Sequence, residues 1–366
     1  MKTKSIFIAM MLVVFTFLVG CNSDNKASDG SEKLTVYTTI FPLEDFTKKI
    51  GGDHVDVKSV FPAGADAHTF EPSTKTMSEM ASADAFIYSG VGAEGFADKA
   101  KGVLENEDVT IVAAGDGIEL HSEEEHDHEH EEEAHEEEHD HEHEEEAHEE
   151  EHDHEHEEEA HEEEHDHEHE EEAHEEEHDH QDEEEGHEGH DHSDGDPHVW
   201  LDPTLSITLA ENVKNALVEL KPEAKEDFEA NFETLKADLE KLDTEFKETV
   251  GGAKTNKILV SHAAYGYWEN RYGLEQISVT GLSPTQEPSQ KQLTEIINTA
   301  KENEIQYVIF DQNISGKIAE VVKNEIKAEA LVLHNLEAAT EEDVKNEEDY
   351  FSLMRQNLET LKKALN

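Results

Sequence analysis

Residues 221–252, KPEAKEDFEANFETLKADLEKLDTEFKETVGG, decide how the rest of the chain is organised. Pro222 suits the first turn of a helix, where a missing N–H costs nothing. Apolar side chains then recur every three or four residues, as on one face of a helix, until Gly251 and Gly252 end the pattern. These side chains are Phe228, Phe232, Leu235, Leu239, Leu242 and Phe246. We predict a helix of roughly 40 Å, long enough to be a stiff connector between two domains.

Short apolar segments on both sides of this helix alternate with segments of helical spacing. The predicted strands are 34–40, 55–61, 85–89 and 109–113 before it, and 257–260, 276–279, 307–310 and 330–333 after it. Helical segments at 41–50, 74–83, 290–303 and 315–326 separate them. Such alternation predicts an α/β protein with two lobes, each a parallel-type sheet flanked by helices. The predicted lobes are 34–221 and 253–366, joined by the backbone helix 222–252.

An insertion in the first lobe, residues 121–196, carries most of the charge of the chain. It holds 44 acidic residues, 22 histidines and no lysine or arginine, in a chain whose net charge is −65. The sequence HDHEHEEEAHEEE repeats every 13 residues from His126 onward. Because the repeat has almost no apolar side chains to bury, we predict that this loop is disordered. Its many imidazoles and carboxylates are predicted to bind Zn²⁺ at weak sites. The acidic balance of the whole chain argues against nucleic acid as a partner.

Three interpretations of this loop stay open. It collects zinc for a main site, it slows transport when zinc is in excess, or it is a tolerated low-complexity expansion. The repeat also creates HEEEH at 135–139, 148–152, 161–165 and 174–178, which matches the H-E-x-x-H motif of zinc peptidases. That motif needs a stable helix docked on a core, and the flanking residues here are Glu, His and Asp. We therefore expect no enzyme, and a zinc-dependent peptidase is a disfavoured alternative.

The beginning of the chain has the features of an export signal. A short basic start is followed by an apolar run at 5–20, which is shorter than the ~20 residues that a membrane-spanning helix needs. Leu18-Val19-Gly20-Cys21 resembles the lipobox of bacterial lipoproteins, in which cleavage precedes a cysteine that then receives lipid. Cys21 is the single cysteine of the chain, so no internal disulfide is possible. We expect a signal peptide at 1–20, a lipid anchor on Cys21 and a flexible tether at 21–33, which would hold the protein at the extracytoplasmic face of a cell membrane.

Sparse histidines outside the insertion indicate a metal site. His68 in FPAGADAHTFEPS, His262 in ILVSHAAYGYW and Asp311 after YVIF each lie shortly beyond a predicted strand. Ligands of open α/β sheets bind beyond the carboxyl ends of the strands. His198 in DPHVWLDP can join them if its loop folds back. Three imidazoles and one carboxylate would make a tetrahedral zinc site.

Each of these residues also has a structural interpretation. A histidine near a strand end is more often a hydrogen-bonded structural residue than a ligand, and an aspartate there is more often a helix cap. Asp311, which precedes Asn313-Ile314-Ser315, fits such a cap. His334 in VLHNLE also follows a predicted strand and is the rival ligand, whereas His54 in GGDHVDV fits a surface turn.

Four segments carry a resemblance to a known family. FPAGADAHTFEPS, DPHVWLDP, LVSHAAYGYWENRYGL and GLSPTQEPS resemble those of the zinc and manganese solute-binding lipoproteins of ABC importers (cluster A-I type), and the resemblance extends over nearly all of the chain after Cys21. It implies two α/β lobes, a long backbone helix and a metal held between the lobes by His68, His198, His262 and Asp311. Manganese-binding members resemble this pattern but carry a carboxylate at the position of His262. A third imidazole favours zinc, because manganese prefers oxygen ligands.

The resemblance implies that the protein captures Zn²⁺ outside the cytoplasm and delivers it to an ABC permease. Four protein ligands close the coordination sphere of the metal, which is binding chemistry rather than catalysis. Neutral imidazole is required, so affinity should fall below about pH 6. A manganese importer of the same family is the alternative. Members of this family can also act as surface adhesins, and a monomer is the simplest expected state.

Overall fold

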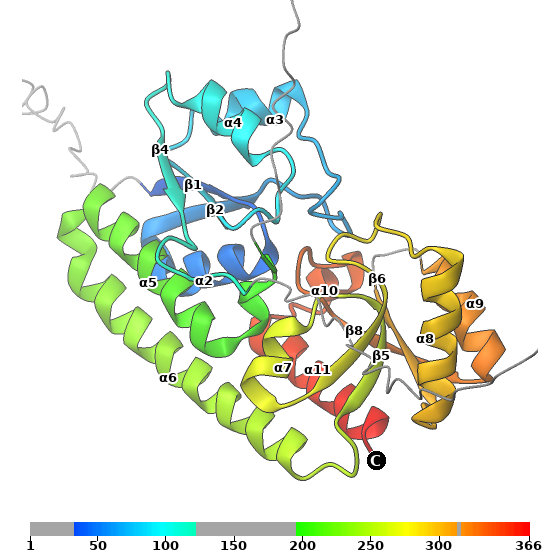
Figure 1. Ribbon diagram of the computed structural model, residues 1–366. Helices are drawn as coiled ribbons and strands as arrows, with labels where there is room; N and C mark the ends of the chain where they lie inside the picture. Colours follow the sequence, from blue (N-terminus) through cyan, green and yellow to red (C-terminus); the bar gives the residue numbers. More distant parts are fainter. Residues whose placement is uncertain (1–32, 122–194, 313–315) are drawn as a thin grey trace, which may run out of the picture. The chain divides into compact units, whose positions relative to one another are not determined.

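The structure is a computed structural model that describes residues 33–121, 195–312 and 316–366. The expected signal peptide, Cys21, nearly all of the tether and almost all of the His-rich insertion lie outside the described residues. Two four-stranded parallel sheets make up the framework, ordered β2-β1-β3-β4 and β6-β5-β7-β8 (Figure 1). The first contains β1 (Leu34–Thr38), β2 (Val55–Ser59), β3 (Ala85–Tyr88) and β4 (Thr110–Ala113). The second contains β5 (Lys257–His262), β6 (Glu275–Thr280), β7 (Tyr307–Asp311) and β8 (Glu329–Leu333). The predicted fold class is confirmed.

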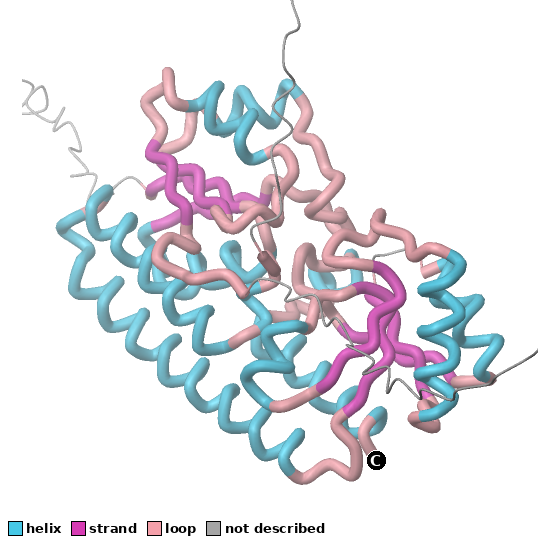
Figure 2. The backbone as a smooth tube through the Cα atoms, in the orientation of Figure 1, coloured by secondary structure: helices cyan, strands magenta, loops and turns pink. Residues whose placement is uncertain are grey.

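Both sheets have the same topology, since in each the first strand lies between the second and third strands. Figure 2 shows the two sheets (magenta) as separate groups with loops (pink) between them. The helices with the first sheet are α2 (Phe41–Gly51), α3 (Thr74–Met80) and α4 (Ala97–Leu104). Those with the second are α7 (Gly266–Tyr272), α8 (Gln290–Glu302), α9 (Lys317–Ile326), α10 (Glu341–Lys345) and α11 (Tyr350–Ala364). Parallel strands need such crossover helices, which cover the faces of each sheet.

The long helix α6 (Lys225–Gly251) buries the apolar face that the sequence predicts. The start of the helix differs from the prediction of a helix over 222–252. Pro222 opens a separate 3-10 turn, η3 (Pro222–Ala224), and α6 begins three residues later. Helix α5 (Pro203–Leu220) packs along α6, and α2 packs on both. Helices α7 and α11 contact α6 as well, so this helix connects the two lobes (Figure 1).

One continuous apolar core extends through both lobes. Its largest buried side chains include Trp200, Trp268, Phe246 and Tyr350. The ring of Phe246 on α6 lies 5.1 Å from that of Trp268 on α7, which joins the connector to the second lobe. A smaller core lies between the second sheet and helices α8 and α9. The lobe boundaries near residues 221 and 252 stay predictions.

The short elements differ most from the sequence-based expectation. Helices α4, α7 and α10 have five to eight residues, too few for a clear apolar period. Helix α11 was missed although its start has a capping box, in which Asp349 accepts from the Ser352 N–H at 2.8 Å and the Ser352 hydroxyl pairs with the Asp349 N–H at 2.9 Å. No helix within the described ranges combines the length and apolar character that a membrane crossing requires.

Candidate metal centre

Four loops and strand ends converge on one group of potential metal ligands. His68 lies in the loop after β2, and His262 is the last residue of β5. His198 precedes the 3-10 turn η2 (Val199–Leu201), and Glu337 lies in the loop after β8. One potential ligand atom from each of the four residues lies within 4.8 Å of the others. Among the residues that the structure describes, this is the one such group of three or more His, Cys, Asp or Glu side chains.

The three imidazole rings face one another at close range. The ring centroids of His198 and His262 are 4.9 Å apart, and His68 lies 5.5 Å from His198 and 5.8 Å from His262. Glu337 Oε1 lies 3.6 Å from His68 Nε2 and 3.9 Å from His198 Nε2. The side chains of His198 and His262 are 0% exposed and that of Glu337 is 1% exposed, so water has little access to them.

Each of these histidines has one buried ring nitrogen without a hydrogen-bond partner in the described structure. The atoms are His68 Nε2, His198 Nε2 and His262 Nδ1. Leaving a buried polar atom unpaired costs about 1–3 kcal/mol, and proteins rarely do so without a functional reason. Three such lone pairs beside one carboxylate are the donor set that a divalent metal of borderline softness prefers. The residues therefore fit a metal ion.

The second nitrogen of His198 is fixed by a carboxylate. Asp196 Oδ1 lies 2.7 Å from His198 Nδ1 and accepts the backbone N–H of His198 at 2.9 Å. A protonated Nδ1 leaves the Nε2 lone pair free for a metal. Burial lowers the pKa of His198 despite the attraction of Asp196. The ring is therefore neutral at pH 7, as metal binding requires.

His262 is fixed at Nε2 instead. That nitrogen lies 2.8 Å from the carbonyl oxygen of Leu282, and Nδ1 lies 3.5 Å from Asp311 Oδ2. Burial alone would lower the pKa of His262, but interactions with Asp311, Glu337 and the Leu282 carbonyl outweigh it and raise the pKa. A cation at this position, either a proton or a metal, is thus favoured by the surrounding carboxylates.

Glu337 is held as an anion. Its Oε2 accepts the backbone N–H of Ala67 at 3.0 Å, and its Oε1 accepts from the Asn335 amide at 3.0 Å. Burial favours the neutral acid, but His68 and the other two imidazoles outweigh it and lower the pKa of Glu337 to about 2. Glu337 is therefore a charged ligand candidate at all physiological pH values.

The structure brings together His68, His198 and His262, but it places Asp311 beside them and outside the group of four. Asp311 Oδ2 accepts from the Ser261 hydroxyl at 2.9 Å, and Oδ1 accepts from the Tyr265 hydroxyl at 2.8 Å. Its Oδ2 also lies 3.5 Å from His262 Nδ1, about as close as Glu337 Oε1 lies to His68 Nε2.

The rival candidate His334 also stays outside the group. Its Nε2 lies 3.0 Å from Asp343 Oδ2, and its Nδ1 accepts the backbone N–H of Leu336 at 2.9 Å. Both ring nitrogens thus have protein partners, as the structural interpretation of a strand-end histidine expects.

Glu337 was missed by sequence reasoning although it lies in the same loop, four residues beyond the end of β8. The signal that could have found it is this position after a strand end, which it shares with the other candidates.

The described ends of the His-rich insertion meet beside His198. The backbone N–H of Asp196 donates to the carbonyl oxygen of His121 at 2.9 Å. The hydroxyl of Tyr267 on α7 donates to the carbonyl oxygen of Asp196 at 2.8 Å, and the ring of His121 lies 4.9 Å from that of Tyr267. The two described ends of the insertion therefore pair with each other, and Asp196 lies two residues before the ligand candidate His198.

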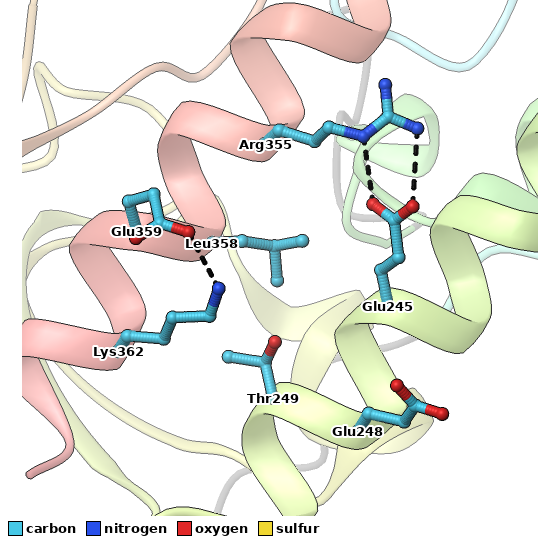
Figure 3. Close-up of a pocket in the computed structure, with 7 residues that line it drawn as sticks. All are labelled: Glu245, Glu248, Thr249, Arg355, Leu358, Glu359 and Lys362. Carbon is cyan, nitrogen blue, oxygen red and sulfur yellow. Dashed lines mark hydrogen bonds and ion pairs between the residues drawn. The ribbon is translucent and has the colours of Figure 1, made fainter.

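A surface pocket between α6 and α11 has a different character (Figure 3). Its volume is about 410 Å³, and none of its lining residues belongs to the metal group. Glu245 accepts from Arg355 Nε at 2.9 Å, and Lys362 donates to Glu359 at 2.6 Å, so its charges are largely paired with one another (Figure 3). It offers no convergent ligand set.

Comparison with known proteins agrees with this geometry. Residues 36–364 match the family model ZnuA, described as zinc-uptake complex component A, periplasmic. The chain is 34% identical over 370 residues to the zinc-binding protein AdcA of Streptococcus pyogenes serotype M3, covering 99% of this chain and 61% of AdcA. It is 31% identical over 354 residues to the high-affinity zinc uptake system protein ZnuA of Bacillus subtilis, covering 96% and 94% of the two chains.

A solved structure extends the comparison to three dimensions. The Zn(II)-bound ZnuA-like domain of Streptococcus pneumoniae AdcA aligns with a TM-score of 0.64 and 28% identity, covering 91% of this chain and 99% of that domain. The present chain spans 61% of the length of the AdcA relative from S. pyogenes, and nearly all of the shorter ZnuA relative. The family model matches about nine tenths of the chain, and we conclude that it belongs to the ZnuA family of zinc-uptake components.

Proposed function

We propose that this protein captures Zn²⁺ outside the cytoplasm and delivers it to an ABC-type permease. The observation that carries the proposal is the group of three unpaired, buried imidazole nitrogens around one ionised carboxylate. Membership of a zinc-uptake family and the names of the relatives support zinc as the cargo. The expected permease partner rests on the family membership.

We infer that His68, His198, His262 and Glu337 are the four ligands. The prediction that Asp311 completes the set stays untested. Both of its oxygens accept hydroxyl hydrogen bonds, and Oδ2 lies 3.5 Å from His262 Nδ1, the unpaired nitrogen that would bind the metal. An outer carboxylate pairs with the opposite ring nitrogen of a metal-binding histidine, and here that nitrogen meets the Leu282 carbonyl instead. Asp311 would therefore add negative charge beside the metal-facing nitrogen of His262.

The chemistry of the donor set favours zinc over manganese and binding over catalysis. Three imidazoles suit a borderline metal, whereas manganese prefers carboxylate, carbonyl and water ligands. Catalytic zinc sites have three protein ligands and an open position for water, but here four side chains converge and are almost wholly buried. The family is one of transport components and is not an enzyme family. The four HEEEH matches lie outside the described residues.

Attachment to the membrane through Cys21 and an extracytoplasmic location are parts of the same proposal. The family description as a periplasmic component supports a location outside the cytoplasm.

We propose further that the His-rich insertion collects zinc for the main site. Its support is the backbone hydrogen bond between Asp196 and His121, because Asp196 also pairs with the ligand candidate His198.

The decisive experiment is metal competition on chelator-stripped protein with the variants His262→Ala, Glu337→Gln, Asp311→Asn and, as a control, His54→Ala. His54 Nε2 lies 2.9 Å from Asp227 Oδ2, and His54 takes no part in the group of four. We expect one tight zinc site that His262→Ala and Glu337→Gln abolish, that Asp311→Asn weakens and that His54→Ala leaves intact. Preferential manganese binding, or a tight zinc site that survives His262→Ala, would contradict the proposal. Loss of the site in Asp311→Asn with retention in Glu337→Gln would restore Asp311 as the fourth ligand.

A further inference from the structure

A buried carboxylate outside the metal group lies in the loop between β3 and α4. This residue, Glu94, is 5% exposed. Its Oε1 accepts the backbone N–H of Ser89 at 2.7 Å and the hydroxyl of Thr39, and its Oε2 accepts the hydroxyl of Ser89. Thr39 directly follows β1 and Ser89 directly follows β3, so Glu94 ties its own loop to the carboxyl ends of two neighbouring strands.

The three donors to Glu94 are all neutral groups, a backbone N–H and two hydroxyls. Burying a charged group costs free energy even where hydrogen bonds offset part of the cost. In return, hydrogen bonds to a carboxylate are stronger than those between neutral groups, so the loop is held firmly at these two strand ends. The position of Glu94 is therefore best explained by what its loop holds in place.

The backbone beside Glu94 lies directly against the backbone of His68. A Cβ on Gly95 would lie 2.6 Å from the carbonyl oxygen of His68, so close that one of the two would have to shift. The Gly95 N–H also points to the carbonyl oxygen of Ala67, with the two atoms 3.5 Å apart. The loop after β3 thus forms the floor on which the His68 backbone rests.

Phe96 extends this floor beneath the segment that carries His68. Its ring is 1% exposed and lies 5.9 Å from the ring of Phe61 and 6.0 Å from that of Phe70, on either side of His68 in the chain. Within the segment, Asp66 Oδ1 accepts the His68 N–H at 3.0 Å, which closes a local turn. Asp66 therefore shapes the turn, whereas the loop after β3 sets where the turn lies.

We propose that Glu94 is a positioning residue for zinc binding, because by fixing the loop after β3 it sets the position of His68 relative to His198 and His262. The ring centroid of His68 lies 5.5 Å and 5.8 Å from the other two. Groups that bind a metal must be held within about 0.5 Å of the productive geometry, so a displaced turn lowers zinc affinity. The inference rests on the proposed zinc capture with His68 as a ligand, and it holds whichever carboxylate completes the site.

The first test compares Glu94→Ala with Glu94→Gln in full-length protein stripped of metal. Zinc affinity is measured against a chelator strong enough to keep the weak sites expected in the His-rich insertion empty. Glu94→Ala removes all three bonds, and we expect zinc affinity to fall by roughly 10- to 100-fold, as for other outer supports of a metal ligand. Glu94→Gln keeps an oxygen for Thr39 and the Ser89 N–H, and its amide can donate to the Ser89 hydroxyl, so its affinity should stay close to that of the parent protein. An equal loss in both variants would show that the charge of Glu94 acts on the metal, and would overturn the inference.

Asp45→Ala is the matched control for loss of a buried carboxylate. Asp45 on α2 is 8% exposed and pairs with Lys49 Nζ at 2.6 Å, and it takes no part in the metal group. This variant should unfold at a lower temperature in the absence of metal while its zinc affinity stays that of the parent protein. A fall in zinc affinity equal to that of Glu94→Ala would mean general destabilisation and would also overturn the inference.

Gly95→Ala displaces the His68 turn without removing Glu94, so it serves as the test if Glu94→Ala fails to fold. Its control is Gly102→Ala on α4, where the added methyl group meets open space. One equivalent of cobalt(II), which fills the tight site first, reports the ligand geometry through its visible absorption. We expect lower zinc affinity and a changed cobalt spectrum in Gly95→Ala and Glu94→Ala, and parent-like values in Gly102→Ala and Asp45→Ala. Parent-like affinity and spectrum in Gly95→Ala or Glu94→Ala would overturn the inference. A tight zinc site that is absent from the parent protein, or that survives His68→Ala, would instead overturn the proposed function.

Discussion

Asp196→Ala tests whether the orientation of His198 depends on its carboxylate partner. Asp196 Oδ1 pairs with both His198 Nδ1, at 2.7 Å, and the His198 backbone N–H, at 2.9 Å. His198 is fully buried, so neither group gains a water molecule easily when the carboxylate is removed. The His198 ring would then be free to rotate or to change tautomer, and its Nε2 lone pair would no longer point steadily at the other ligands.

The expected magnitude follows from these two bonds. Each buried donor left unpaired costs about 1–3 kcal/mol, so the free energy of unfolding should fall by about 2–6 kcal/mol. Loss of an outer partner of a metal ligand should lower zinc affinity by roughly 10- to 100-fold. Zinc affinity is measured by competition with a chelator of known strength, and stability is measured by urea unfolding without metal.

Two glycine variants separate orientation of His198 from general damage. A methyl group on Gly266 would lie 2.6 Å from Asp196 Oδ2, so Gly266→Ala must displace the carboxylate. Gly102, in helix α4, has open space at the same position. Because Gly→Ala in a helix usually stabilises by about 0.5–1 kcal/mol, Gly102→Ala should stabilise the protein and leave zinc affinity unchanged. Gly266→Ala should lower zinc affinity. Parent-like zinc binding by Asp196→Ala, or equal behaviour of the two glycine variants, would refute the reasoning.

Three further predictions concern pH and packing. Zinc affinity should drop steeply from pH 7 to pH 5 in competition titrations, because protons displace the metal from the imidazoles; an affinity that stays level would argue against histidine ligands. Burial raises the pKa of Asp343, but hydrogen bonds from His334 and Thr340 outweigh it and lower the pKa from 3.8 to about 2. The stability that Asp343 contributes is thus present above about pH 4 and lost as pH falls toward 2, and Asp343→Asn should flatten acid unfolding curves in that window. Phe246→Ala should lower the free energy of unfolding by about 3–5 kcal/mol in urea, since Phe246 is fully buried against Trp268; a loss below 1 kcal/mol would contradict its place in the shared core.

The sequence by itself determined the elements of the fold. The spacing of Phe228 through Phe246 defined the buried face of α6, and alternating apolar segments placed all eight described strands to within a few residues. Local patterns suffice here because an amphipathic helix and a buried parallel strand each bury their apolar residues at a fixed period. Turn and helix boundaries, as at Pro222 and Lys225, depended on packing that the local pattern does not contain.

The three histidines were also visible in the sequence, because each lies in a segment close to a strand end or to the insertion. The choice between two carboxylates was not visible there. Asp311 and Glu337 both follow strands of the second sheet, and nothing local says which side chain reaches the imidazoles. Only the tertiary structure places both carboxylates, with Asp311 Oδ2 3.5 Å from His262 Nδ1 and Glu337 Oε1 3.6 Å from His68 Nε2. Hydrogen bonds from the Ser261 and Tyr265 hydroxyls orient Asp311, and those from Ala67 and Asn335 orient Glu337. The directions of these carboxylates depend on hydrogen bonds that form only in the folded protein, and the bond from Ala67 to Glu337 also requires the two lobes to have packed together.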